Sequence, residues 1–454
     1  MRSVGIICEY NPFHNGHLRQ LRLARELAGE DCALVCLMSG NYVQRGEPAI
    51  FPKVLRAEAA LRCGADLVLE LPLTVALSSA EGFAAGGVSI LTALGCDDLC
   101  YGTETENNNL IMSTAKANLD PAFDALLRAE LSTGCSYPAA RQRVIDQLVG
   151  ALSERPQSRS VEVLSHPNDL LAVEYCKAIL KQNSPLRPLP IRRTGAYHAE
   201  ILNPEAPSAT ALRAALKAFP LGAELSGGQR DFNTICAAEL RKWYPMQNRC
   251  PSVHTGADEG VYRRQSGDGS PIGTPIREPS PDWRAAVPSE VISLYDSASI
   301  HTMQAGERAV LAVLRTLPDA AFQALPYGSE GLWSKFMKNC RSRAAIDEII
   351  DATKSKRYTR TRIQRMLLCA FLGLSAADLE RKPPYVRVLG FTDRGRAALR
   401  EMKDRFPLVN AGERPADPEY WKLENRAADF YSLFSEAGPR PAGEEGRLRV
   451  CGIP

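Results

Sequence analysis

The chain opens with VGIICEYNPFHNGH at residues 4–17, the stretch that decides its fold. Residues 4–8 form an uninterrupted apolar run, which is typical of a strand buried on both faces of a sheet. A polar loop follows, and residues 16–28 then carry leucine and alanine at helical spacing up to Gly29. A strand, a loop and a helix in this order predict the first unit of a parallel α/β sheet.

The same alternation continues through the first hundred residues. Apolar runs at 33–39, 66–71 and 98–101 predict further strands, and periodic segments near 55–63 and at 79–94 predict the helices between them. We therefore expect a Rossmann-like, doubly wound parallel sheet that binds its ligand at the carboxyl ends of the strands. Residues 40–52 are expected to form a polar loop.

The rest of the chain divides by composition. Residues 105–160 are helical in pattern, a strand is expected at 189–193, and helices are expected at 169–180 and from Ser208. Gly, Ser, Pro and Asp accumulate within 225–290, helical periodicity resumes at 305–374, and one strand candidate lies at 385–390. We expect four regions: an α/β domain at 1–217, a variable and partly disordered linker or insertion at 218–290, a helical basic region at 291–380, and a small C-terminal α/β region at 381–454.

Composition sets limits on the class of protein. The 454 residues have a net charge of +3 and are 45% hydrophobic, as in ordinary globular proteins. No apolar run is long enough for a membrane span or a secretory signal. The 13 cysteines include no CxxC pair and no cluster with the six histidines, so we expect buried free thiols in a cytoplasmic protein and no metal held by the protein.

The sequence His14-Asn15-Gly16-His17 lies where the first strand turns into the first helix. Free N–H groups at a helix N-terminus bind anions, Gly16 allows close approach, and two imidazoles can donate to phosphate oxygens. The alternative is that both histidines only cap or pack the turn. Ser208 to Arg213 open a later helix with hydroxyls and a guanidinium, which suit a triphosphate but also describe an ordinary N-cap with a surface arginine.

Positive charge is concentrated in residues 335–365, which contain ten Lys or Arg and three acids. Such a segment favours salt-sensitive contacts with RNA phosphates, although a solvated helix face is the alternative. Arg387, Arg394 and Arg396 are candidates to extend this surface. Arg45 and Lys53 follow the second strand and are expected either to reach phosphate or RNA or to lie in a solvated loop.

Seven blocks in order resemble one family: EYNPFHNGH (9–17), MSGNYVQRGEPA (38–49), GADLVLELP (64–72), YGTE (101–104), PNDLLAVEY (167–175), SATALR (208–213) and KRYTRTRIQR (356–365). They resemble the bacterial tRNA(Met) cytidine acetate ligases, within the HIGH-type nucleotidyltransferase superfamily. The resemblance covers about 1–217 and 290–450 and does not extend across 225–290.

The resemblance implies an ATP-dependent ligase with a defined set of partners. Acetate and ATP, with Mg²⁺, would give acetyl-adenylate and pyrophosphate, and the acetyl group would pass to N4 of the wobble cytidine (position 34) of elongator tRNA(Met), forming N4-acetylcytidine. His14 and His17 are the expected catalytic residues. The expected ATP-binding residues are Ile7, Cys8, Glu9, Tyr10, Asn11, Pro12, Phe13, His14, Asn15, Gly16, His17, Leu18, Arg19, Gln20, Gly102, Asn168, Arg193, Thr194, Ser208, Thr210 and Arg213. The expected tRNA-binding residues are Lys335, Lys338, Lys356, Arg357, Arg360, Arg362 and Arg365.

Two departures from the family pattern, and two other functions, stay open at this point. Asn168 is followed by Asp169 where many relatives are expected to have a second amide, and residues 192–198 only approximate a basic strand followed by Tyr-His. The alternatives are a small-molecule adenylyltransferase, which needs no long basic extension, and a non-catalytic RNA-binding protein, against which the intact histidine motif argues. The sequence gives no indication of oligomeric state.

Overall fold

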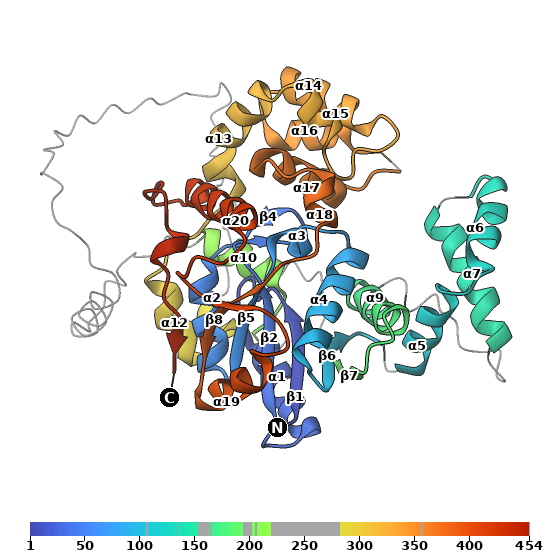
Figure 1. Cartoon of the computed structure of the whole chain (residues 1–454). Helices are drawn as coiled ribbons and strands as arrows, with labels where there is room; N and C mark the ends of the chain where they lie inside the picture. Colours follow the sequence, from blue (N-terminus) through green and yellow to red (C-terminus); the bar gives the residue numbers. More distant parts are fainter. Residues whose placement is uncertain are drawn as a thin grey trace, which may run out of the picture. The chain divides into compact units, whose positions relative to one another are not determined.

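The structure is a computed structural model that describes residues 1–105, 108–135, 137–152, 163, 166–193, 202–204, 207–218, 282–355 and 357–453. The described residues of Met1–Leu221 and Asp282–Pro454 form one compact unit (Figure 1). Most of the expected 218–290 segment lies outside the described residues, as do Thr194 and Lys356.

The centre of the unit is an eight-stranded sheet in the order β10-β8-β5-β2-β1-β6-β7, with β9 also paired to β8. Five of its strands are mutually parallel, which confirms the Rossmann-like parallel sheet predicted from the sequence. They are β1 (Ser3–Cys8), β2 (Ala33–Ser39), β5 (Leu67–Leu71), β6 (Asp98–Thr103) and β7 (Arg187–Arg192). The strand order reverses at β1, between β2 and β6, which is the place where such sheets bind ligands.

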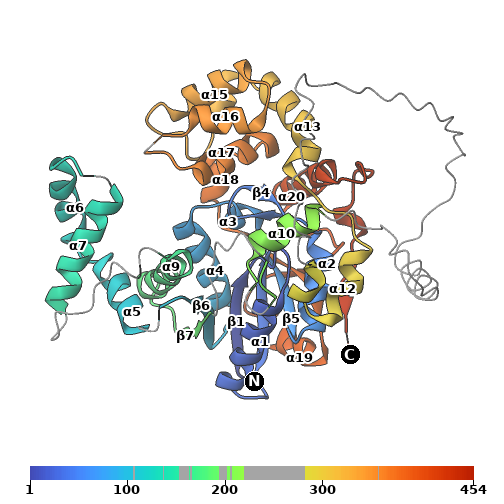
Figure 2. The ribbon, with the colours of Figure 1, turned by 180° about the vertical axis from the view of Figure 1, so that it is seen from behind.

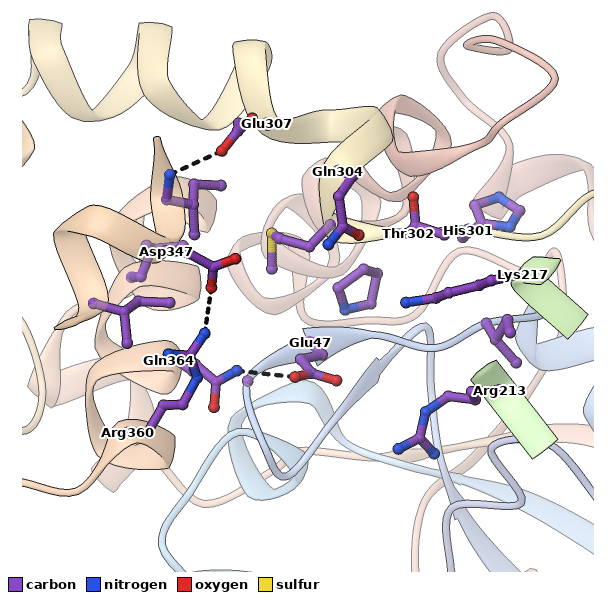
Figure 3. Close-up of a pocket in the computed structure, with 17 residues that line it drawn as sticks. Glu47, Arg213, Lys217, His301, Thr302, Gln304, Glu307, Asp347, Arg360 and Gln364 are labelled. Carbon is purple, nitrogen blue, oxygen red and sulfur yellow. Dashed lines mark hydrogen bonds and ion pairs between the residues drawn. The ribbon is translucent and has the colours of Figure 1, made fainter. Parts of the chain in front are cut away.

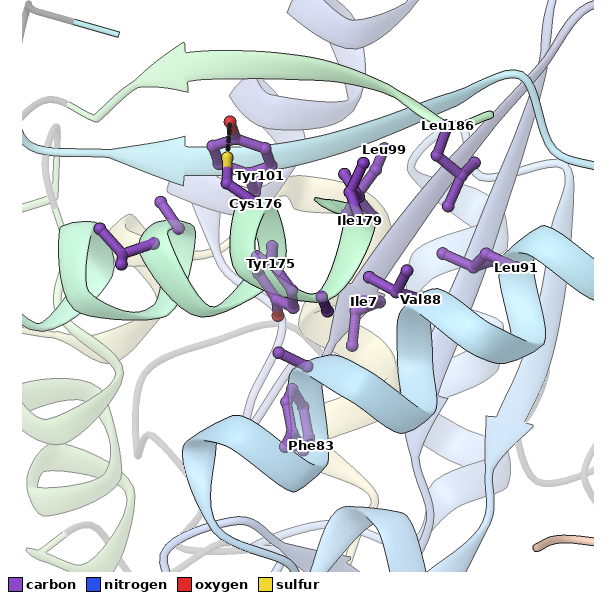
Figure 4. Close-up of a cluster of buried hydrophobic side chains, with 14 of the residues drawn as sticks. Ile7, Phe83, Val88, Leu91, Leu99, Tyr101, Tyr175, Cys176, Ile179 and Leu186 are labelled. Carbon is purple, nitrogen blue, oxygen red and sulfur yellow. Dashed lines mark hydrogen bonds between the residues drawn. The ribbon is translucent and has the colours of Figure 1, made fainter. Parts of the chain in front are cut away.

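Helices cover both faces of the sheet because side chains alternate between the faces along each strand. On one face Leu34, Cys36 and Met38 pack toward α1 (Asn15–Ala28), α2 (Lys53–Arg62), α10 (Ala209–Ala218) and α12 (Ser289–Asp296). On the other face Val35 and Leu37 pack in a core with α4 (Ala80–Leu94), α9 (Pro167–Lys181) and α19 (Asp393–Met402). Figure 4 shows part of this second core between α4, α9 and the strands.

The connection between β6 and β7 is long and helical, as expected for residues 105–160. Before α9 it contains α5 (Asn108–Ala117), α6 (Phe123–Ser132) and α7 (Tyr137–Leu152), which pack on one another and, through α5, on α9 (Figure 2).

The C-terminal strands complete the N-terminal sheet, which the sequence did not indicate. Of β8 (Val386–Phe391), β9 (Leu408–Asn410) and β10 (Cys451–Gly452), the first pairs antiparallel with β5 and the other two pair parallel with β8. The expected partition into four domains stays a prediction. In the structure, however, residues 381–454 share a sheet with the first region.

A separate helical core is formed mainly by helices between residues 303 and 431. It contains α13 (Met303–Thr316), α14 (Asp319–Gln323), α15 (Leu332–Ser342), α16 (Ile346–Thr353), α17 (Arg360–Leu372), α18 (Ala376–Glu380) and α20 (Pro418–Tyr431). These helices pack on segments that follow the carboxyl ends of β2 and β5, since Tyr42 Oη donates to Ala427 O (2.9 Å) and Tyr327 Oη donates to Leu77 O (2.8 Å).

The expected polar loop at 40–52 is instead a largely buried hairpin, with short strands β3 (Tyr42–Val43) and β4 (Glu47–Pro48). Gly46 lies in its turn with φ +79°, and an added Cβ would lie 2.4 Å from the backbone nitrogen of Arg365 in α17. Only glycine combines that conformation with so close an approach. The prediction was wrong because nothing in the local sequence shows that α17 and α20 will cover this segment.

Candidate active site

The HxGH segment lies at the carboxyl end of β1 and begins α1, as predicted. His14 is the N-cap residue, with extended backbone, and α1 starts at Asn15. The first turn therefore lies at the edge of the sheet where β1 and β6 end, and two of its N–H groups are used in the cap, Gly16 N–H on His14 Nδ1 and His17 N–H on His14 O (2.8 Å). This arrangement of a strand end and a helix N-terminus suits the phosphates of a nucleotide.

The two histidines cap the helix reciprocally. His14 Nδ1 accepts a hydrogen bond from Gly16 N–H (3.1 Å), and His17 Nδ1 accepts one from His14 N–H (3.3 Å). Their rings stack with centroids 3.7 Å apart and planes inclined by 21°. The capping alternative and the catalytic prediction are therefore compatible, because each ring uses only one of its two nitrogens in the cap.

Both rings are held neutral. Burial lowers the pKa of His14 to about 3, and the charges of Arg193 and Arg213 act in the same direction. Burial also lowers the pKa of His17 well below its usual range, and His14 and Arg193 lower it further. A neutral ring whose Nδ1 accepts a hydrogen bond carries its proton on Nε2, so the capping contacts assign an Nε2–H donor to each histidine.

Two arginines from later elements reach this loop. Arg213 of α10 donates from Nη1 to Asn11 O (2.8 Å) and from Nη2 to Thr210 Oγ1 (3.3 Å). Arg193 follows β7, and its charge lowers the pKa of both histidines. The site therefore combines neutral donors, a helix N-terminus and two permanent positive charges. Ser208 is buried, and its hydroxyl accepts from Ala211 N–H (3.0 Å) as an N-cap.

Gly102 and Asn168 lie at the neighbouring strand end. A Cβ on Gly102 would lie 3.1 Å from the side chain of Arg193, so glycine lets that arginine cross β6 closely. Asn168, in the first turn of α9, donates from N and Nδ2 to Glu104 Oε1 (3.1 and 2.8 Å). Asp169 accepts from the backbone N–H groups of Glu104 (2.7 Å) and Thr105 (3.0 Å), which explains why a carboxylate follows Asn168.

Several residues that support the loop carry no signal in the sequence. Arg56 of α2 is fully buried and donates to the carbonyls of Glu9 (2.5 Å) and Ser39 (3.1 Å) at the ends of β1 and β2. Tyr295 Oη donates to Phe13 O (3.1 Å), and Asn15 Nδ2 donates to Ala285 O (3.0 Å). The Tyr295 and Ala285 contacts come from α12 and from the 3₁₀ turn before it, which are far from the loop in the chain.

Two of the expected basic contacts are buried rather than presented to a ligand. Lys53 is 4% exposed, and its Nζ pairs with Glu70 Oε2 and Glu445 Oε1, each at 2.7 Å. Arg387 is 1% exposed and pairs with Glu424 (2.9 Å) and Glu445 (3.1 Å). Both predictions were wrong because three carboxylates from distant segments converge on these cations inside the protein.

The basic helical segment is less free than its composition indicates. Arg365 is 8% exposed and donates to Gln44 O (3.3 Å), so it binds the β3–β4 hairpin instead of facing solvent. Arg360 pairs with Asp347 and Asp351, and Arg362 donates to Tyr327 O (2.8 Å). Arg357 pairs with Glu330 but keeps 70% of its side chain exposed, and Lys335 and Lys338 are also exposed.

The described residues form neither a metal centre nor a membrane span. Within the described ranges, no group of three His, Cys, Asp or Glu residues is placed to hold a metal ion. None of the helices described by the structure is both long and apolar enough to cross a membrane.

Comparison with known proteins places these features in one family. A family model described as HIGH Nucleotidyl Transferase matches residues 1–244 and 268–445. A protein of Kosmotoga olearia named tRNA(Met) cytidine acetate ligase is 32% identical, covering 96% of this chain and 95% of its own. The apo crystal structure of Thermotoga maritima TmcAL is 26% identical with a TM-score of 0.77, and the same protein bound with alpha-thio ATP gives 0.75, each covering 100% of both chains.

Proposed function

Because the chain belongs to the HIGH nucleotidyl transferases and, within them, to the tRNA(Met) cytidine acetate ligase family, we propose that it joins acetate to a cytidine of tRNA(Met) at the expense of ATP. Acetate and ATP give acetyl-adenylate and pyrophosphate, and the acetyl group then passes to N4 of the wobble cytidine of elongator tRNA(Met). The proposal includes a cytoplasmic location, since tRNA and ATP are both available there.

The pair of neutral histidines at the N-terminus of α1 is the observation that carries the proposal. In the first step an acetate oxygen attacks the α-phosphorus, and the bond from that phosphorus to pyrophosphate breaks. Acetate is ionised at neutral pH, so the step needs no general base. What it needs is alignment and donors aimed at the oxygens where negative charge increases. The Nε2–H groups of His14 and His17 are such donors, fixed in direction by their Nδ1 contacts.

Permanent cations complete the phosphate site. Arg213 is held by Asn11 O beside the histidines, and we assign Arg193 and Arg213 to the triphosphate or to the departing pyrophosphate. Guanidinium groups suit this role because they present several donors to phosphate oxygens. Mg²⁺ bound to the triphosphate itself would neutralise further charge.

In the second step the N4 amine attacks the acetyl carbonyl, and the bond from that carbon to the AMP oxygen breaks. AMP leaves and the amine loses a proton. We assign contacts with the tRNA to Lys335, Lys338 and Arg357, the exposed members of the expected set, of which Lys335 also donates to Thr353 O (2.9 Å) and Arg357 pairs with Glu330. They would bind phosphates of the RNA in a salt-dependent manner.

Exchange of labelled pyrophosphate into ATP tests the first step. The enzyme should catalyse exchange with acetate and Mg²⁺ in the absence of RNA, and mass spectrometry should detect N4-acetylcytidine once elongator tRNA(Met) is added. A small-molecule adenylyltransferase would give neither acetate-dependent exchange nor modified tRNA. Failure to exchange in a preparation that still acetylates tRNA would contradict a separate adenylate-forming step.

A further inference from the structure

Next to the nucleotide site lies a cavity of about 250 Å³ that none of the preceding roles uses. It is bounded by the β3–β4 hairpin, α10 and the helical region, with residues from α13, α16 and α17 in its wall (Figure 3). The volume lies near the small end of ligand pockets, which run from about 300 Å³ upward. The cavity is therefore suited to a single nucleotide-sized group.

The cavity and the proposed adenylate site share a residue. Arg213 lines the cavity and also donates to Asn11 O in the HxGH loop (2.8 Å). Lys217 lies one helical turn beyond Arg213, and both side chains extend from α10 toward the cavity. One side of the cavity is therefore basic and adjoins the site that we propose for the phosphates.

The β3–β4 hairpin contributes a carboxylate to the wall, Glu47, that has no ion pair with a described residue. Glu47 Oε1 accepts from Gln364 Nε2 (2.9 Å), and no cation among the described residues pairs with Glu47. Of the other acids of the wall, Asp347 pairs with Arg360, whereas Glu307, like Glu47, accepts from a neutral donor, Ile346 N–H (2.8 Å). Lys217, for its part, has no hydrogen bond or ion pair with any described residue.

We propose that this cavity binds the acceptor cytidine, with Glu47 accepting a hydrogen bond from the cytosine N4 amine and Lys217 binding an adjoining phosphate. This assignment rests on the proposed function. A carboxylate accepts from the exocyclic amine of cytosine, whereas uracil presents a carbonyl oxygen at the same position and is repelled. A base that reacts at its edge must leave its stack and enter such a pocket, and the walls on α16 and α17 belong to the basic region expected to bind RNA.

Two half-reactions allow the assignment to be tested separately from the proposed function. Glu47→Gln and Lys217→Met are compared with Glu348→Gln, which removes an exposed carboxylate of α16 outside the cavity. We expect both cavity variants to keep acetate-dependent pyrophosphate exchange within about twofold, and to lower acetyl transfer to elongator tRNA(Met) about tenfold or more. The Glu348→Gln variant should match the wild type in both assays.

A competition experiment examines which base the cavity accepts. Cytidine 5′-monophosphate should inhibit acetyl transfer by the wild type more strongly than uridine 5′-monophosphate, and Glu47→Gln should abolish that difference. Unchanged transfer in Glu47→Gln, or equal loss of exchange and transfer, would overturn the assignment, because Glu47 would then be either uninvolved or part of the adenylate site. Absence of exchange and of transfer in the wild type would instead overturn the proposed function.

Discussion

Replacing His14 with asparagine separates the two roles that the structure gives this residue. Asparagine is among the strongest N-cap residues, and its Oδ1 can accept from Gly16 N–H as His14 Nδ1 does. It places no donor where the Nε2–H of the imidazole lies. His14→Ala, by contrast, also loses the cap, which costs about 1 kcal/mol. Because His14 is only 1% exposed, the smaller alanine also leaves a larger cavity than asparagine does.

The expected loss in rate follows from the function of the donor. Removing one fixed donor to a developing oxyanion typically costs about 2.7–4 kcal/mol, or roughly 10²–10³ in rate. We expect His14→Asn to lower acetate-dependent pyrophosphate exchange by about this factor and to lose less stability than His14→Ala in urea unfolding. Exchange by His14→Asn at the wild-type rate would refute the role of His14 as a donor.

The same variant makes a prediction about pH. The pKa of His14 is about 3 in the folded protein, below the 6.5 of an exposed histidine. Between these values the unfolded chain binds a proton that the folded chain does not, so stability falls as the pH is lowered from 6.5 toward 3. The slope reaches about 1.4 kcal/mol per pH unit for one proton. His14→Asn should reduce this loss between pH 6.5 and 5, and an unchanged slope would show that the ring is protonated in the folded state.

Three further predictions concern the buried ion cluster and the basic surface. Lys53→Met leaves Glu70 and Glu445 without their shared cation and should lower the free energy of unfolding by about 3–5 kcal/mol in urea; a loss below about 1 kcal/mol would contradict the contacts described. Burial raises the pKa of Glu70 to about 7, so between pH 4.5 and 7 the folded state binds a proton that the unfolded chain does not. Glu70 therefore makes the free energy of unfolding fall as the pH rises through this range. Glu70→Gln should remove that part of the pH dependence, and an identical pH profile would contradict this reasoning. Lys338→Glu combined with Arg357→Glu should impair acetylation of tRNA and reduce its salt dependence with exchange unchanged; parallel loss of both activities would show a structural role.

The HxGH part of the candidate site was predictable because its residues are close together in the chain. The strand at 3–8 and the helix from Asn15 are local structures, and the histidines lie at their junction. Topology then brings β6 beside β1, so the ends of these strands and Gly102 follow from the strand order. The tautomer of each histidine was not predictable, because it depends on backbone N–H groups that only the folded turn positions.

The basic residues show where reasoning from composition fails. Lys53, Arg365 and Arg387 read as surface charges in the sequence, yet each is buried against partners from distant segments. A charged side chain is stable in the interior only when paired or hydrogen-bonded, and the pairing partners here come from elements that are remote in sequence. Counting charges within a window of the chain cannot identify them.

Local pattern alone determined the alternation of strands and helices in the first hundred residues, the parallel character of that sheet, and the position of the histidine motif at the first strand end. Each depends on hydrophobic period or on residues within a few positions of one another. Only the tertiary structure decided that the C-terminal strands join the same sheet, that the 40–52 segment is covered, and that a cavity lies between α10 and the helical region. These features arise from contacts between segments separated by up to several hundred residues. The free energy of such contacts depends on both segments, so the hydrophobic period of one segment does not predict it.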